Sequence, residues 1–112
     1  MLVGIAVPAI AAATVLSPAE IKASFGTGKP FAAASTTGSK TYSFTLNPDG
    51  TAMRTAKGST TVVAGTWRVN DKGYCSKWGS GTESCYTIEK NGKSFMVRDT
   101  LGKTVSRWTL PA

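Results

Sequence analysis

Turn-forming residue pairs recur along most of this 112-residue chain, roughly every 8–12 residues. Between them, apolar and polar side chains alternate with a period of two, which is typical of half-buried β-strands. The clearest turns are Asn-Pro-Asp-Gly at 47–50, Asn-Asp-Lys-Gly at 70–73 and Asn-Gly at 91–92. This spacing predicts an antiparallel sheet whose strands follow one another as hairpins.

The alternation also assigns side chains to the two faces of the predicted sheet. In residues 41–46, Phe44 and Leu46 lie on the apolar face, and the strand around Trp67 shows the same pattern. Across the turn that follows residue 46, Met53 is expected to face Phe44. The apolar face would therefore continue from one strand to the next.

One helix is predicted over residues 18–25. Ser17 is followed by Pro18 and Glu20, which gives a capping box with proline at the first helical position. Gly26 would end the helix. Two turns are not stable alone, so the apolar side of this helix must pack on the rest of the protein.

The strand count favours a closed shape over an open sheet. We expect about seven or eight strands, including an additional one near residues 31–35, and one short helix cannot cover so wide an apolar face. The prediction is a mainly β protein: an antiparallel meander forming a small barrel, closed or half-open, with the helix plugging one end. Residues 14–112 would form this single domain, and the small, polar residues 32–39 its most mobile loop.

The first residues carry no charge. Residues 1–15 are too few for a transmembrane helix, which needs about 20 apolar residues. They have the length of a signal-peptide core, and Ala-Ala-Ala at 11–13 suits cleavage near Ala13. Residues 1–13 are thus expected to be a signal peptide and the mature protein to be periplasmic or secreted, the alternative being a buried amino-terminal helix or strand.

Cys75 and Cys85 are predicted to form a disulfide. They lie symmetrically about the turn at 79–81, so a hairpin would place them opposite each other, and Tyr74 opposite Tyr86. Facing Cβ atoms about 4.5–5.5 Å apart need little adjustment to form the bond. An oxidising compartment would preserve it.

Several motifs are spread over residues 16–110: Leu-Ser-x-x-Glu-Ile at 16–21, Gly-Thr-Trp at 65–67, Tyr-Cys at 74–75 and Cys-Tyr at 85–86. In these motifs the chain resembles a group of small uncharacterised exported proteins of proteobacteria. More distantly, it resembles lipocalin-like β-barrels, in which Gly-x-Trp lies on the first strand and not, as here, near the centre. The resemblance implies a signal peptide followed by a barrel, and it brings no activity and no functional residue.

The composition argues against catalysis and metal binding. The chain has no histidine, so the commonest general base and the commonest metal ligand are both absent. Its six acidic residues occupy capping, turn or scattered strand positions, namely Glu20, Asp49, Asp71, Glu83, Glu89 and Asp99. We therefore predict a protein that is not an enzyme and that has no metal and no cofactor.

Aromatic side chains provide two candidate binding sites. A small apolar ligand would enter between the helix and the barrel mouth and contact Phe44, Met53, Trp67 and Phe95, unless the barrel is filled by its own side chains. Trp78, beside Lys77 on the predicted disulfide loop, would present a rigid aromatic surface to an envelope protein, as in an inhibitor or assembly factor. The alternative is that Trp78 folds back over the disulfide or the barrel mouth.

The basic residues provide a third candidate binding site. Thirteen basic and six acidic residues give a net charge of +7, but the basic residues are spaced singly, which favours a solvated surface. If the strand residues Arg54, Arg68, Arg98 and Arg107 point outward together, they would form a basic face for anionic lipid or glycan. Nucleic acid is the less favoured partner because the predicted location is outside the cytoplasm. The sequence thus favours a binding or interaction module of the bacterial envelope.

Overall fold

The computed structural model describes residues 14–36 and 40–111. It contains the helix α1 (Pro18–Phe25) and nine strands. The strands are β1 (Thr14–Val15), β2 (Phe31–Ser35), β3 (Thr41–Leu46), β4 (Thr51–Ala56), β5 (Val62–Val69), β6 (Tyr74–Trp78), β7 (Ser84–Asn91), β8 (Ser94–Arg98) and β9 (Thr104–Thr109). The predicted signal peptide at 1–13 lies outside the described residues.

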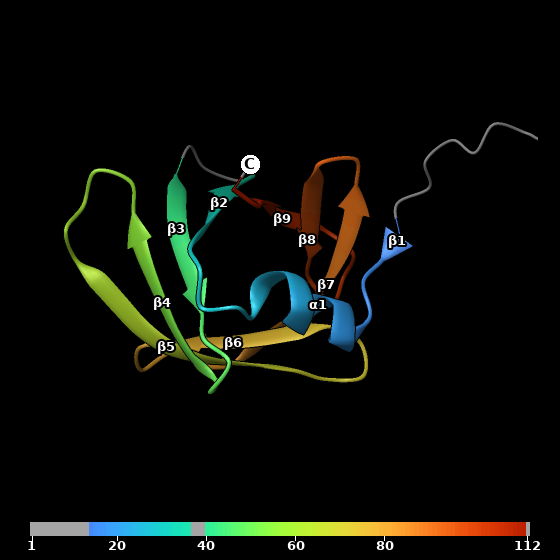
Figure 1. Cartoon of the computed structure of the whole chain (residues 1–112), viewed down its shortest axis with the longest axis horizontal. Coiled ribbons are helices and arrows are strands. Elements are labelled where there is room, and N and C mark those ends of the chain that lie inside the picture. The colour runs from blue at the N-terminus through green and yellow to red at the C-terminus, as the bar shows by residue number, and fades with distance from the viewer. Residues whose placement is uncertain (1–13, 37–39, 112) are drawn as a thin grey trace, which may run out of the picture.

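Strands β2 to β9 form a closed antiparallel barrel (Figure 1). Each strand pairs with the next along the chain, and β9 pairs with β2 to close the ring. The short β1 pairs with the end of β7, where Thr14 lies opposite Lys90. The predicted meander barrel is confirmed, and its closed form is the one observed.

The additional strand expected near residues 31–35 is present as β2. Residues 32–35 were also expected within a mobile loop, and this part of the prediction is wrong because both neighbours of β2 pair with it: Ala33 lies opposite Tyr42 of β3 and opposite Trp108 of β9. Residues 37–39 of that loop lie outside the described part of the chain.

Helix α1 has the predicted bounds and closes one end of the barrel. The capping box is formed, because the backbone N–H of Glu20 donates to the Ser17 hydroxyl at 3.2 Å and that of Ser17 donates to the Glu20 carboxylate at 2.9 Å. Phe25 is fully buried, and its ring centre lies 4.9 Å from that of Phe31, of Phe95 and of Trp108. Edge-on packing of these rings seals this end.

The turn at 47–50 changes the register that the sequence predicted. The N–H of Gly50 donates to the carbonyl of Asn47, Gly50 has φ +93°, and the N–H of Asn47 donates to the carbonyl of Thr51. This three-residue connection places Phe44 opposite Arg54 and not opposite Met53. The expectation for Met53 is therefore wrong: its side chain points outward and is 42% exposed.

The predicted disulfide is present on the outer wall of the barrel. Cys75 lies opposite Cys85 in the β6–β7 pair, and their sulfur atoms are bonded at 2.03 Å. Tyr74 lies opposite Tyr86, also as predicted, and both rings point to the barrel interior, where their centres are 5.9 Å apart. No helix in the described part of the chain has the length and apolarity needed to cross a membrane.

Candidate functional site

A pocket of about 210 Å³ lies inside the barrel, at the end opposite α1. Because the strands alternate in direction, β2, β4, β6 and β8 end here, and β3, β5, β7 and β9 begin here. We call it the barrel pocket. It is lined by Ser35, Tyr42, Phe44, Arg54, Tyr74, Ser76, Trp78, Tyr86, Val97, Val105, Ser106 and Trp108.

Arg54 is the charged side chain of the barrel pocket. Its guanidinium carbon lies 4.7 Å from the centre of the Trp78 ring and 5.5 Å from that of Tyr42. Attraction between a cation and an aromatic face partly offsets the loss of water around the charge. Within the described residues, the Arg54 guanidinium has no ion pair and no hydrogen bond, so its N–H groups are available to a ligand.

Tyr74 contributes a buried hydroxyl to the same pocket. The residue is 1% exposed, and its hydroxyl has no hydrogen-bond partner of normal geometry among the described residues. Burial raises the pKa of this hydroxyl well above its ordinary value of 10.0, an effect that nearby Ser76 and Arg54 only partly offset. The hydroxyl is therefore protonated at neutral pH and able to donate a hydrogen bond.

Trp78 forms one wall of the pocket because Gly65 leaves space for it. These residues are directly opposite each other in the β5–β6 pair. A Cβ atom at Gly65 would lie 2.8 Å from the Trp78 ring and 2.3 Å from the carbonyl oxygen of Lys77. The glycine of the Gly-Thr-Trp motif thus allows the indole to pack closely on the barrel wall, where its centre is 5.3 Å from that of Phe44.

Of the four predicted ligand-lining residues, Phe44 alone lines the barrel pocket. Trp67 and Phe95 lie at the end that α1 closes: the Trp67 indole N–H donates to the Asn47 carbonyl at 2.7 Å, and Phe95 packs on the helix. Met53 is on the outer wall. An opening between helix and barrel was expected, but these side chains fill that end, and the pocket lies at the other.

The two residues proposed for partner binding point in opposite directions. Lys77 is exposed on the outer wall, whereas Trp78 is half-buried in the pocket. The sequence left two positions open for the Trp78 side chain, exposed to a partner or folded back over the disulfide or the barrel mouth. In the structure it is folded back into the barrel mouth.

The four strand arginines do not form one outward face. Arg54 points inward, which corrects the prediction, because the turn at 47–50 shifts the register of β4 by one residue. On the outer wall, Arg68 donates two hydrogen bonds to Glu83, at 2.7 and 3.0 Å, and Arg98 pairs with Glu89 and Thr104. Arg107 is exposed.

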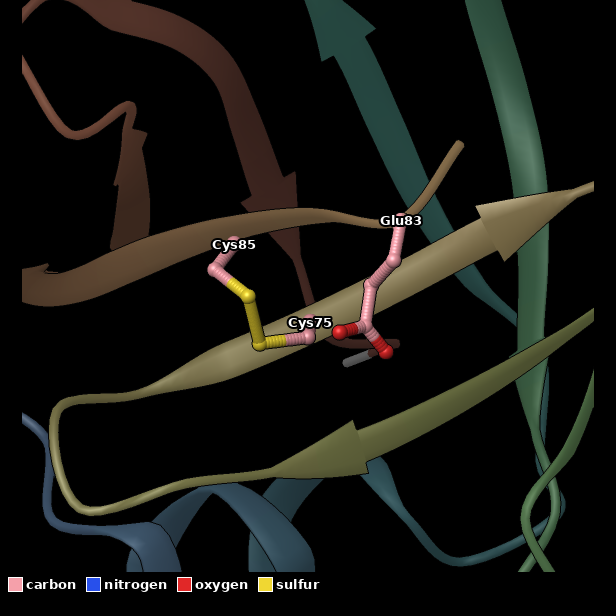
Figure 2. Close-up of side chains that lie close together, drawn as sticks. All are labelled: Cys75, Glu83 and Cys85. Atoms are coloured by element: carbon pink, nitrogen blue, oxygen red, sulfur yellow. A yellow bond between two sulfur atoms is a disulfide. The ribbon is translucent and has the colours of Figure 1, made fainter. Parts of the chain in front are cut away.

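Cys75, Glu83 and Cys85 form a compact cluster outside the pocket (Figure 2). The two sulfur atoms are bonded to each other and present no thiolate. The Glu83 carboxylate is held by Arg68, and these hydrogen bonds lower its pKa. Asn70 donates to Cys75 Sγ at 3.3 Å. The cluster therefore braces the β6–β7 hairpin and offers no set of free metal ligands.

A second depression, of about 560 Å³, lies on the outside of the barrel over β2, β3 and the β4–β5 turn. We call it the outer groove. Its strand positions carry small side chains such as Ala32, Ser43 and Thr55, and Lys57 is its charged residue. The barrel pocket combines enclosure, an unpaired cation and an unpartnered hydroxyl, and is therefore the stronger candidate for a binding site.

Most residues of this pocket were not predicted from the sequence. Tyr74, Ser76, Tyr86 and Trp108 were not named as site residues. A signal for the tyrosines was available: if the cysteines bond on the outer wall, their neighbours at 74 and 86 must point inward. Arg54 was predicted as an anion-binding residue, but on the outer face of the barrel instead of the inner face.

Comparison with known proteins gives a family and no function. Residues 2–107 match the model of a domain of unknown function, DUF4859. No curated protein and no solved structure matches the chain significantly. Because the match extends over nearly the whole sequence, the chain belongs to the DUF4859 family.

Proposed function

We propose that this protein is a non-catalytic binding module that takes up one small molecule in the barrel pocket. The observation that carries the proposal is the Arg54 side chain, held between Trp78 and Tyr42 inside the barrel with no acidic partner among the described residues. The guanidinium is half-buried against two aromatic rings, and a charge that is partly removed from water without an ionic partner favours the binding of an anion.

The size of the pocket limits the ligand. A cavity of about 150 Å³ holds benzene, and pockets for drug-sized molecules begin at about 300 Å³. At about 210 Å³, the barrel pocket suits a single ring or a short chain with one polar group. A long acyl chain or an oligosaccharide would not fit inside it.

The aromatic walls of the pocket are held in position by the barrel. Tyr42, Phe44, Trp78 and Tyr86 come from three strands of a closed sheet, so the pocket exists before the ligand binds. Rigid aromatic walls lower the entropy lost on binding. This supports uptake of a planar or apolar body between the rings.

We also propose that the protein works outside the cytoplasm, in the bacterial envelope. The disulfide supports this location, since such bonds persist mainly in oxidising compartments. The apolar residues 1–15 and the resemblance to exported proteobacterial proteins agree with it. Alkylation of the protein in cells of its native host would test the location: free thiols at Cys75 and Cys85 would contradict it.

The two other functions considered from the sequence have less support. A protein partner at the Cys75–Cys85 loop would lack the aromatic anchor, because Trp78 points inward. Binding to an anionic surface has less support because Arg68 and Arg98 are already paired with glutamates. These pairs reduce the positive charge available to such a surface.

The test is a screen of single-ring and short-chain compounds by thermal shift, with native mass spectrometry of the purified protein for bound molecules. Two variants make the same change in different places. Ser76→Leu fills the barrel pocket, and Ser43→Leu adds the same side chain to the outer groove. We expect Ser76→Leu to abolish stabilisation by the ligand and Ser43→Leu to preserve it.

A measurement on the unmodified protein covers the case in which Ser76→Leu does not fold. The ligand should shift the indole N–H resonances of Trp78 and Trp108, which line the pocket, more than that of Trp67 at the closed end. The proposal is wrong if no compound binds, or if binding is lost in Ser43→Leu and not in Ser76→Leu.

A further inference from the structure

We infer that the ligand of the barrel pocket carries a carboxylate, bound by Arg54 and Tyr74 with its apolar body between the aromatic rings. This inference rests on the proposed function and names the chemical class of the ligand: a small aromatic or short-chain carboxylic acid. It follows from two unsatisfied polar groups that line one cavity.

The first group is the Arg54 guanidinium. All six acidic residues of the chain belong to its described part, and the two ion pairs found there are Arg68–Glu83 and Arg98–Glu89. The rings of Trp78 and Tyr42 interact with the positive charge but cannot accept the planar N–H groups as a carboxylate does. A carboxylate matches the guanidinium in charge and in its two-pronged geometry.

The second group is the Tyr74 hydroxyl. It is buried in the pocket lining near Ser76, with no hydrogen-bond partner of normal geometry among the described residues, a condition that costs free energy. Tyr74 and Arg54 both line the barrel pocket. An anionic oxygen near Arg54 would therefore be well placed to accept the tyrosine proton in a hydrogen bond.

The donor set favours a carboxylate over a phosphate. Arg54 is the one cation of the pocket, and the hydroxyl of Ser106 is engaged with the Ala34 carbonyl at 3.2 Å. A phosphate group carries up to two negative charges, which the single cation of the pocket does not balance. The rings of the lining and the side chains of Val97 and Val105 suit the body of an organic acid.

The charge at the open end agrees with an anionic ligand. The turns that surround the opening carry Lys40, Lys57 and Lys103, against Asp99 and Glu83. Glu83 is neutralised by Arg68. The balance at this end is therefore positive, which raises the local concentration of anions and their rate of association.

The test compares probes of nearly equal shape and different charge. Benzoate, benzamide, cyclohexanecarboxylate, phenyl phosphate and inorganic phosphate are titrated into the oxidised full chain by calorimetry. We expect benzoate to bind at least about tenfold more tightly than benzamide, since a hydrogen bond to a charged group contributes this much or more. Phenyl phosphate should bind more weakly than benzoate, and inorganic phosphate should not compete.

Three variants assign the effect to residues. Arg54→Met should remove the preference for benzoate over benzamide, whereas Arg107→Met, the same change at an exposed arginine of the outer wall, should leave it unchanged. Tyr74→Phe should weaken benzoate binding by about fivefold or more, because it removes one hydrogen bond to the anion. The circular dichroism and unfolding curve of each variant show whether it is folded.

The outcomes separate this inference from the proposed function. If benzamide binds as tightly as benzoate, or Arg54→Met keeps the preference for the acid, the pocket binds small molecules but not through an anion. If phenyl phosphate binds more tightly than benzoate, the head group is a phosphate and the assignment is wrong. If neither acids nor neutral compounds bind, both proposals fail. The comparison of benzoate with benzamide uses the unmodified protein, so it does not depend on any variant folding.

Discussion

The guanidinium carbon of Arg54 lies 4.7 Å from the centre of the Trp78 ring, inside the barrel. The two residues come from β4 and β6, and the strand between them carries Gly65 opposite Trp78. Because this glycine has no side chain, the indole can lie against the wall and the arginine can extend over it. The guanidinium and the indole therefore line the same pocket.

We expect Arg54→Met to change the free energy of unfolding by no more than about 1 kcal/mol. Methionine keeps the apolar stem and its contact with Trp78, and it removes a charge that has no ion pair among the described residues. Urea unfolding of the variant beside wild type measures the difference. A loss above about 3 kcal/mol would show that Arg54 has a structural partner and would weaken the case for a binding role.

Two neighbouring lysine substitutions test the register of β4. Ala52 is 1% exposed and Met53 is 42% exposed, so their side chains lie on opposite faces of the barrel wall. Ala52→Lys should prevent folding or cost more than about 3 kcal/mol, because it buries an unpaired charge. Met53→Lys should stay within about 0.5 kcal/mol of wild type. Thermal unfolding distinguishes them, and the reverse order would restore the register expected from the sequence.

Gly65→Val should destabilise the barrel by about 2 kcal/mol or more. A Cβ atom at this position would lie 2.3 Å from the Lys77 carbonyl oxygen, a backbone atom that cannot move without disturbing the β5–β6 pair. The matched control is Ala64→Val on the exposed face of the same strand, which should be close to neutral. Equal stability of the two variants in urea would show that Trp78 does not need this space.

Removal of the disulfide in the double variant Cys75→Ala, Cys85→Ala should cost about 2–3 kcal/mol. The bond closes a short loop, with a separation of 10 residues, so the entropy it removes from the unfolded chain is modest. The midpoint of urea unfolding provides the measurement, and wild type treated with a reducing agent should match the variant. Reduced wild type that is as stable as the oxidised protein would contradict a stabilising role.

The capping box should make stability depend on pH. The backbone N–H of Ser17, and then its hydroxyl, hold the pKa of the Glu20 carboxyl below its usual value of 4.5. A carboxyl whose pKa is lower in the folded state stabilises the fold above pH 4.5, and this contribution is lost as the pH falls through the folded-state pKa. Urea unfolding at pH 6 and pH 3 should show a larger advantage of wild type over Glu20→Gln at pH 6 than at pH 3. A constant difference at both values would indicate that the charge of Glu20 has no effect.

Much of the fold could be predicted from the sequence alone because the signals for it are local. Ser17, Pro18 and Glu20 fixed the start of α1 because a capping box is a contact within one turn of chain. Cys75 and Cys85 could be paired because their hairpin is short and symmetric. A barrel, closed or half-open, could be predicted from many strands and a single short helix, since an apolar face must be covered. The β2–β9 pairing of the structure decided that it is closed.

What the sequence could not provide was the side of the barrel wall on which certain side chains lie. Arg54 and Met53 exchanged faces because one residue in the turn at 47–50 decides the register, and alternation reverses with a shift of one. The meeting of Tyr74, Trp78 and Arg54 around one cavity depends on closure of the sheet, which brings together strands that are distant along the chain. Sequence alone thus predicted the helix, the strands of the barrel, their order and the disulfide, whose causes are local. The tertiary structure alone decided the pocket, because its residues are joined only by packing across the barrel.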